Sequence, residues 1–221
     1  MIKAIPLHDR DKYYQNADVN TLVNLSLDNL DNELFLNIIH LIQMTNLKYI
    51  HKTINKYKSN VDFSQKEIYD NIMHCFDRIY NGELNEDNLR GAFLELIVHK
   101  FLNNKYSSNP LYKGAINCNV EIFGKNIYKT VDVFAFCGNK GLVAESKIGS
   151  YYFEDHDIEN LNKIYVDSNY YLKPFIITLA TESYINKKLD ELLQNDSSNA
   201  WVYSSDINII SLDNITDFFH N

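Results

Sequence analysis

Two acidic residues and one lysine stand in two apolar stretches, where their side chains could act on one substrate. Asp132 lies within TVDVFAF, and Glu145 and Lys147 follow the apolar residues 142–144. Side chains two positions apart on a strand project from the same face, so we expect Glu145 and Lys147 to point together. Carboxylate oxygens suit Mg²⁺, which usually keeps several waters. This set predicts a divalent-cation site, where Lys147 would orient or deprotonate a water or stabilise developing charge.

A hairpin must bring Asp132 next to Glu145 for such a site to form. Residues 129–136 and 142–148 are rich in strand-forming types, and CGNKG (137–141) between them is typical of a turn. Pairing about residue 139 sets Asp132 opposite Ser146, and a bulge or strand twist would bring Glu145 alongside. Burial and a nearby cation are expected to lower the pKa of Lys147 toward the range of a general base.

Glu95 is a further candidate, because it is the only acid in the apolar stretch RGAFLELIVHK (90–100). A carboxylate on a packed helix face is costly unless it is paired or bound to metal. Gly91 lies one turn earlier on the same face, where the missing side chain lets another backbone or a ligand approach closely. Glu95 is therefore expected either to join the cation site or to find a partner.

The composition limits the classes of protein that are possible. The chain has 221 residues, of which 45% are apolar and 23% charged, as in ordinary globular proteins. The net charge of −8 argues against nucleic-acid binding through bulk charge, so such binding needs a local basic patch or metal ions. No apolar run is long enough for a membrane span, and the N-terminus has no apolar signal core, so a cytoplasmic protein is expected. Three cysteines without a CxxC pattern predict buried free thiols.

The hydrophobic periodicity predicts helices first and a mixed sheet afterwards. Residues 1–84 are expected to be helical, with one helix over 34–57 and another over 64–80 that opens on a capping box at Ser64 and Glu67. A helix over 85–104 leads into the remaining elements. These are strands at 115–124, 129–136, 142–148 and 173–180, helices at about 155–172 and 182–195, strands in AWVYS and INIISL, and a short terminal helix in DNITDFF. This order predicts a mixed sheet covered by helices.

The motif and the order of elements resemble a known family. Asp132, twelve residues, and then Glu145-Ser146-Lys147, with Glu95 on the preceding helix, resemble the PD-(D/E)xK nuclease superfamily with its restriction-endonuclease-like fold. The αβββαβ order over about residues 86–180 is similar to the superfamily core. The resemblance implies an α/β three-layer α-β-α sandwich with a mixed central sheet over 85–221, plus the helical region 1–84. Thr130-Val131 stands where the motif has proline, and the helix after the motif lacks a clear glutamine–tyrosine signature.

The resemblance implies a metal-dependent nuclease that hydrolyses phosphodiester bonds with Mg²⁺ or Mn²⁺. Asp132, Glu145 and Glu95 would hold metal, the Ser146 carbonyl would be a further ligand, and Lys147 would be the catalytic lysine. The resemblance implies DNA as the substrate ahead of RNA. It also implies a homodimer, and a restriction or defence role would fit. Two alternatives stay open: an inactive nuclease-like fold that binds protein or nucleic acid, and a surface Glu/Lys pair beside a salt-bridged Asp132.

Two other groups of residues are candidates for substrate contact. Lys48, Lys52 and Lys56 recur every four residues in a segment, 34–61, that has no acid, so one helix face is basic. That face either contacts nucleic-acid phosphates or is simply solvated. Tyr151, Tyr152 and His156 follow the lysine strand and are candidates as loop residues near the site, whereas the acids between residues 154 and 159 are expected to begin a helix and stay solvated.

Overall fold

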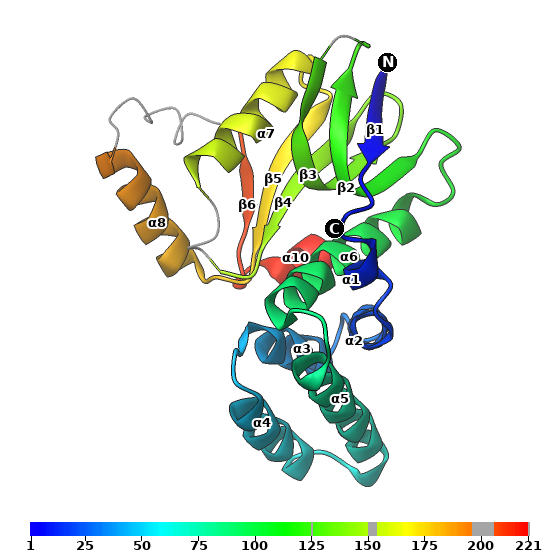
Figure 1. The fold of residues 1–221 in the computed structure, drawn as a ribbon, viewed down its shortest axis with the longest axis vertical. Coiled ribbons are helices and arrows are strands. Elements are labelled where there is room, and N and C mark those ends of the chain that lie inside the picture. Colours follow the sequence, from blue (N-terminus) through cyan, green and yellow to red (C-terminus); the bar gives the residue numbers. More distant parts are fainter. Residues whose placement is uncertain (125, 150–153, 196–205, 221) are drawn as a thin grey trace. The chain divides into compact units, whose positions relative to one another are not determined.

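The computed structural model divides the chain into two compact units (Figure 1). It describes residues 1–124, 126–149, 154–195 and 206–220. The helical unit comprises residues 10–97, and the sheet unit comprises residues 1–9 together with 98–221. Helix α6 (Glu86–Tyr106) contributes residues to both. The domain boundary at residues 84 and 85 stays a prediction.

The helical unit is built around amphipathic helices whose apolar faces are buried. Besides the first part of α6, its helices are α1 (Asp11–Tyr14), α2 (Ala17–Leu27), α3 (Glu33–Gln43), α4 (Leu47–Ser59) and α5 (Phe63–Asn81). The fully buried side chains recur at helical spacing, as Phe35, Ile38 and Ile42 do on α3. Packing of these stripes accounts for most of the helices' stability, since isolated helices of this length are marginal in water.

Two details of the predicted helices are wrong, and both concern the residue at which a helix begins. The single helix predicted over 34–57 is two helices, because the side chain of Asn46 accepts hydrogen bonds from the backbone N–H groups of Lys48 and Tyr49 and so begins α4. Helix α5 begins at Phe63 after Asp62 as N-cap, so the capping box predicted at Ser64 and Glu67 does not form.

The sheet unit contains a six-stranded mixed sheet in the order β1-β2-β3-β4-β5-β6. Its strands are β1 (Ile2–Pro6), β2 (Lys113–Ile122), β3 (Asn126–Phe136), β4 (Gly141–Lys147), β5 (Leu172–Thr178) and β6 (Asn208–Ile210). Neighbours from β1 to β4 are antiparallel, whereas β4, β5 and β6 run parallel. The parallel pairs are joined through α7 (Asp155–Asp167) and α8 (Glu182–Asn195), as parallel connections require.

Strand β1 corrects the expectation that the chain is helical from residue 1. It pairs antiparallel with β2, from Ile2 opposite Ile122 to Pro6 opposite Cys118. Five residues give too little periodicity to separate strand from helix, and Pro6 stands at the end of an edge strand, where proline is tolerated. The pairing partner lies more than one hundred residues away, so the strand is a product of the tertiary structure.

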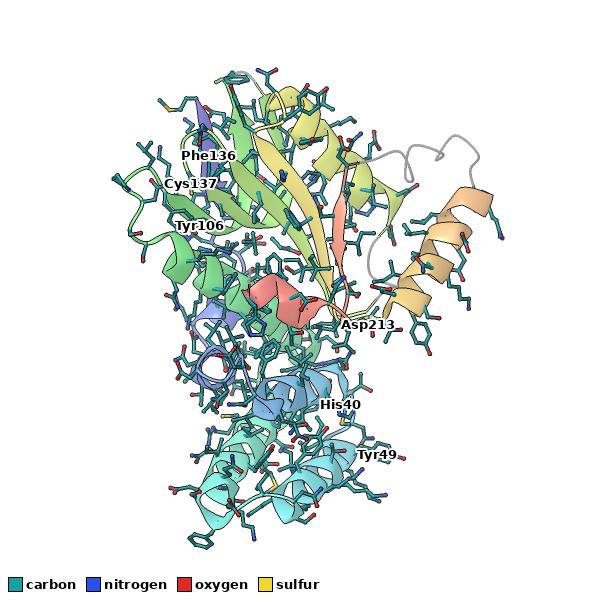
Figure 2. All side chains as sticks on the ribbon, turned by 180° about the vertical axis from the view of Figure 1, so that it is seen from behind. His40, Tyr49, Tyr106, Phe136, Cys137 and Asp213 are labelled. Atoms are coloured by element: carbon teal, nitrogen blue, oxygen red, sulfur yellow. The ribbon has the colours of Figure 1, made fainter. Side chains whose placement is uncertain are left out.

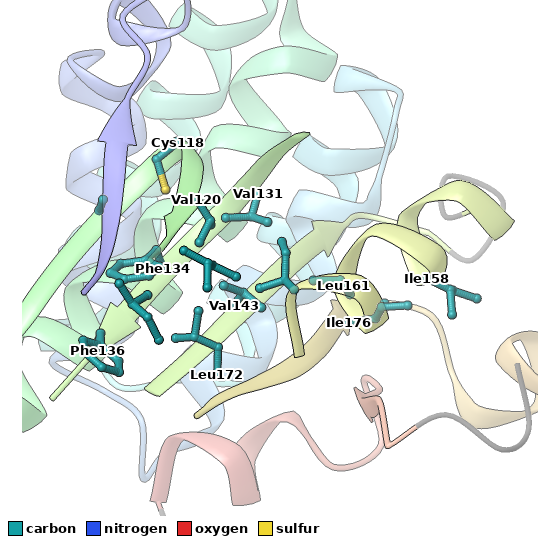
Figure 3. Close-up of a cluster of buried hydrophobic side chains, with 14 of the residues drawn as sticks. Cys118, Val120, Val131, Phe134, Phe136, Val143, Ile158, Leu161, Leu172 and Ile176 are labelled. Atoms are coloured by element: carbon teal, nitrogen blue, oxygen red, sulfur yellow. The ribbon is translucent and has the colours of Figure 1, made fainter. Parts of the chain in front are cut away.

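Helices cover both faces of the sheet, and the predicted three-layer α/β fold with a mixed sheet is confirmed. On one face, residues of α7 and α8 such as Ile158, Leu161 and Ile185 join Phe134 and Val143 of the sheet in a buried cluster (Figure 3). On the other face lie the end of α6 and α10 (Ile215–His220) (Figure 1). There the rings of Phe101 and Phe219 are 5.0 Å apart and those of Phe175 and Phe218 are 6.1 Å apart.

The other predicted elements are present with shifted ends. Helix α7 ends at Asp167, five residues early, and Asn169 and Tyr170 follow with φ of 55° and 64°. This left-handed turn stops the helix before β5. Helix α8 has the predicted bounds, and INIISL contains β6. The strand predicted in AWVYS lies outside the described residues.

Candidate active site

The hairpin of β3 and β4 brings Asp132 alongside Glu145. The strands close with Phe136 opposite Gly141, and Val133 is the partner of Ala144. Continued by one residue beyond this last pair, the register would place Asp132 opposite Glu145. The turn comprises residues 137–140: the N–H of Cys137 donates to the carbonyl of Lys140 at 2.8 Å, and Gly138 has φ of 88°. The predicted pairing of Asp132 with Ser146 is therefore wrong by one residue, and no bulge is needed.

The charged ends of the two strands contact one another through side chains and backbone. Asp132 Oδ2 accepts a hydrogen bond from the backbone N–H of Ser146 at 2.7 Å. Lys147 Nζ donates to Glu145 Oε2 at 3.1 Å, so these two side chains do share one face of β4. The Ser146 side chain alternates to the opposite face, where its buried Oγ has no hydrogen-bond partner among the described residues. A ligand role for the Ser146 carbonyl stays a prediction.

Asp157 is a further acid of this site that the sequence analysis missed. It was expected to be solvated, but it is buried, and its Oδ1 lies 3.6 Å from Lys147 Nζ. Its Oδ2 accepts from the N–H of Glu154 at 3.0 Å, which completes a capping box at the start of α7. The spacing could have revealed it, since Leu161 and Ile164 lie four and seven residues later on the buried stripe.

Three carboxyl groups therefore surround one ammonium group, which leaves an excess of two negative charges when all three are ionised. Burial, and then the charge of Asp132, raise the pKa of Glu145 well above its ordinary value. Burial by itself would lower the pKa of Lys147, but Glu145, Asp132 and Asp157 together raise it above its ordinary value. The expected lowering is thus reversed, and Lys147 is held as an ammonium. Glu145 and Lys147 therefore both hold their protons more tightly than usual, because acidic neighbours surround them.

A polar cavity of about 550 Å³ opens beside Glu145. It is lined by Asn119, Tyr128, Thr130, Glu145, His156, Asp157 and Asn160. The hydroxyl of Thr130 donates to Asn119 Oδ1 at 3.2 Å across the β2–β3 pair. Hydroxyl and amide groups beside a cation site are suited to holding phosphate oxygens. His156, which was expected to lie near the site, is one of the residues that line this cavity. The other two candidates, Tyr151 and Tyr152, lie outside the described residues.

A second group of possible metal ligands lies at the surface of the same unit. One ligand atom each from Glu154, Asp155 and His156 lies within 4.8 Å of the others, and all three side chains are exposed. His156 Nδ1 is 3.2 Å from Glu154 Oε2. Interactions between exposed charges are screened by salt, whereas those of buried charges are screened much less, so an exposed cluster is expected to hold a cation less firmly. This cluster is the alternative location for a cation against which the buried site has to be tested.

Glu95 belongs to the helical unit, where its carboxylate is fully engaged. It accepts hydrogen bonds from Arg10 Nη1 at 2.6 Å and from the hydroxyl of Tyr14, and its exposed fraction is 2%. A Cβ at Gly91 would lie 3.5 Å from Arg10 Nη2, an ordinary van der Waals distance, so the arrangement does not depend on glycine at this position. Pairing with Arg10 satisfies the buried charge, as the cost of burial requires. The metal-ligand role of Glu95 stays a prediction, and it requires the pair with Arg10 to open.

The comparisons with known proteins support the fold. Neither a family model nor a curated protein matches the chain. The structure of protein VC1899 from Vibrio cholerae is similar with a TM-score of 0.51 and 17% identity, over 99% of this chain and 57% of that one. That of Can2 from Sulfobacillus thermosulfidooxidans in complex with cyclic tetra-adenylate has a TM-score of 0.44 and 12% identity, over 99% and 54%. This chain thus spans little more than half the length of either protein, and the first likeness shows the fold alone.

The described helices were also compared with the length and apolarity of membrane spans. None of those in residues 1–124, 126–149, 154–195 and 206–220 is long and apolar enough to cross a bilayer. The cytoplasmic location expected from the sequence stays a prediction.

Proposed function

We propose that this protein is a metal-dependent nuclease of the PD-(D/E)xK type. The observation that carries the proposal is the gathering of three carboxyl groups, from Asp132, Glu145 and Asp157, around Lys147, which leaves an excess of two negative charges when all are ionised. A divalent cation balances that excess, and carboxylate oxygens are the ligands that Mg²⁺ and Mn²⁺ prefer. The adjoining polar cavity offers space for a phosphate group. The three-layer fold is one that the resemblance implies.

The residues take separate roles in this proposal. Asp132 and Glu145 would hold the cation, with the Ser146 carbonyl and Glu95 as further ligands. When bound, the cation lowers the pKa of a water and offsets charge on the phosphate. Lys147, held as an ammonium by Glu145 and Asp157, donates hydrogen bonds to the attacking water or to a phosphate oxygen. Its raised pKa favours this role over abstraction of a proton.

The class of substrate is drawn from the superfamily resemblance. DNA is proposed as the substrate ahead of RNA, and a restriction or defence role belongs to the same proposal. A homodimer is proposed because many proteins of this fold work as dimers, so that both strands are cut. The inactive, nucleic-acid- or protein-binding form of the fold is the competing function, and the absence of cleavage would favour it.

Cleavage of plasmid DNA tests the proposal directly. Wild type with Mg²⁺ or Mn²⁺ is expected to nick or linearise the plasmid, and EDTA is expected to stop it. Lys147→Ala should lower the rate by about 10²- to 10³-fold, as the loss of one stabilising donor does in other active sites. Lys163→Ala is the matched control, because Lys163 is exposed on α7 and pairs with Glu159 at 2.8 Å. If neither DNA nor RNA is cut with either metal, the binding module replaces the nuclease.

A further inference from the structure

A groove along α4 of the helical unit is separate from the acidic site and has the opposite character. Its cavity is about 780 Å³. It is lined by Gln43, Met44, Thr45, Asn46, Tyr49, Lys52, Thr53 and Lys56, which come from the end of α3, the connecting loop and α4. These residues define the α4 groove. Every one of them is neutral or basic, so the groove presents positive charge in a protein of net charge −8.

The lysines of α4 differ in whether their charge is already neutralised. Lys58 forms an ion pair with Asp70, and His51 lies 2.7 Å from Asp77. Lys48, Lys52 and Lys56 are exposed and form no ion pair with any residue that the structure describes. The segment 34–61 itself contains no acid, so the acids that do pair with α4 come from α5. These three ammonium groups are therefore available to an anionic ligand.

The geometry of α4 sets these charges in a row beside an aromatic ring. Positions four and eight apart share a helix face, and at 1.5 Å per residue the row extends about 12 Å. Ile50 and Ile54 are buried on the opposite face. Tyr49 is 63% exposed and borders the same groove as Lys52 and Lys56, and its ring lies at the surface of α4 (Figure 2). An exposed aromatic ring beside a cationic row offers both stacking and charge.

We propose that the α4 groove binds single-stranded nucleic acid, with Tyr49 stacking on a base and the three lysines contacting phosphates. Stacked nucleotides advance about 3.4 Å each, so a 12 Å row serves about three or four phosphates. Aromatic platforms in basic grooves bind single strands, whose base faces are accessible, whereas a duplex keeps its bases stacked. An acidic peptide would use the lysines but gain little from the ring. The inference concerns a binding surface apart from the proposed nuclease site, and the binding itself requires no catalysis.

Binding of a fluorescein-labelled 20-nucleotide oligothymidylate to the full chain, followed by anisotropy in EDTA, tests this inference. Tyr49→Ala is expected to raise the Kd by about 5- to 100-fold, and Tyr49→Phe to stay within about twofold, because the ring and not the hydroxyl stacks. Lys52→Ala/Lys56→Ala should reduce the slope of log Kd against log salt by about 1.4, at 0.7 per phosphate contact. Lys58→Ala is the matched control on the same helix and should leave the slope unchanged, since its charge is paired with Asp70.

The outcomes separate this inference from the nuclease proposal. Unchanged oligonucleotide affinity in Tyr49→Ala overturns the inference, whether or not plasmid is cut. Equal binding of a duplex of the same length, or displacement by polyglutamate with the same affinity for wild type and Tyr49→Ala, also overturns it. Tyr49-dependent binding by a protein that cuts nothing supports the inference and rejects only the catalytic proposal. Melting temperatures of the variants should be measured to check folding; the side chains of Tyr49, Lys52 and Lys56 are exposed, and that of Lys58 is partly buried.

Discussion

Replacing Asp132 with asparagine separates metal binding from folding at the candidate site. Asparagine has the same shape, and its side-chain oxygen can still accept the hydrogen bond that Ser146 N–H donates at 2.7 Å. The substitution removes one of three carboxylates around Lys147, so the excess of negative charge falls from two to one. We expect Asp132→Asn to lose the stabilisation that Mg²⁺ or Mn²⁺ gives the wild type, without loss of the metal-free fold.

The size of the effect follows from mass action. A ligand present at one hundred times its Kd stabilises the folded state by about 2.7 kcal/mol. For a chain of 221 residues, each kcal/mol shifts the melting temperature by about 2–4 °C. Saturating cation should therefore raise the melting temperature of the wild type by about 5–11 °C. In EDTA the variant should melt at or above the wild-type temperature, because Asp132 no longer repels the Glu145 carboxylate.

Thermal melts with EDTA, Mg²⁺ and Mn²⁺ measure this without reference to any activity. Asp155→Asn is the control, since this acid belongs to the exposed cluster with Glu154 and His156 and not to the buried site. A full cation-induced shift in Asp132→Asn would refute the reasoning. So would a shift that persists in that variant but disappears in His156→Ala, because the cation would then occupy the exposed cluster.

Three more predictions concern protonation, thiol reactivity and helix packing. Because the pKa of Glu145 is raised in the folded protein, this group contributes stability when the pH is below its ordinary pKa of 4.5. The contribution is lost as the pH rises through the raised pKa. The free energy of unfolding of Glu145→Gln, relative to that of wild type, should therefore increase between pH 5 and pH 8 in urea melts with EDTA. An equal difference between the two proteins at both pH values would contradict this. Burial raises the pKa of Cys75 to about 11 and of Cys118 to about 12, whereas Cys137 is partly exposed, which corrects the expectation of three buried thiols. One thiol should react rapidly with Ellman's reagent at pH 8, and Cys137→Ser should remove that phase; two fast thiols would argue against the burial. Gly91→Ala should stabilise the protein by about 0.5–1 kcal/mol, because the nearest atom to the new Cβ is 3.5 Å away, and a lower denaturation midpoint would contradict it.

Local sequence patterns predicted most of the fold because they record which side of each element is buried. The apolar run before Glu145 predicted β4, and the periodicity of 182–195 predicted α8 with the observed bounds. Patterns of this kind do not say which distant segments pair. Strand β1 was missed for that reason, since it forms only through its pairing with β2. The break at Asn46 was missed because the apolar stripe continues across it.

The sequence by itself determined the types of group at the candidate site: an acid, then an acid and a lysine two residues apart on a strand. Tertiary structure decided which charges gather there and how they balance. The four-residue turn set Asp132 beside Glu145, and the start of α7 brought Asp157 to Lys147, 3.6 Å from its ammonium. Glu95 instead pairs with Arg10, which lies eighty-five residues earlier in the chain. Charge balance in a buried site depends on distance and desolvation, which spacing along a chain does not encode.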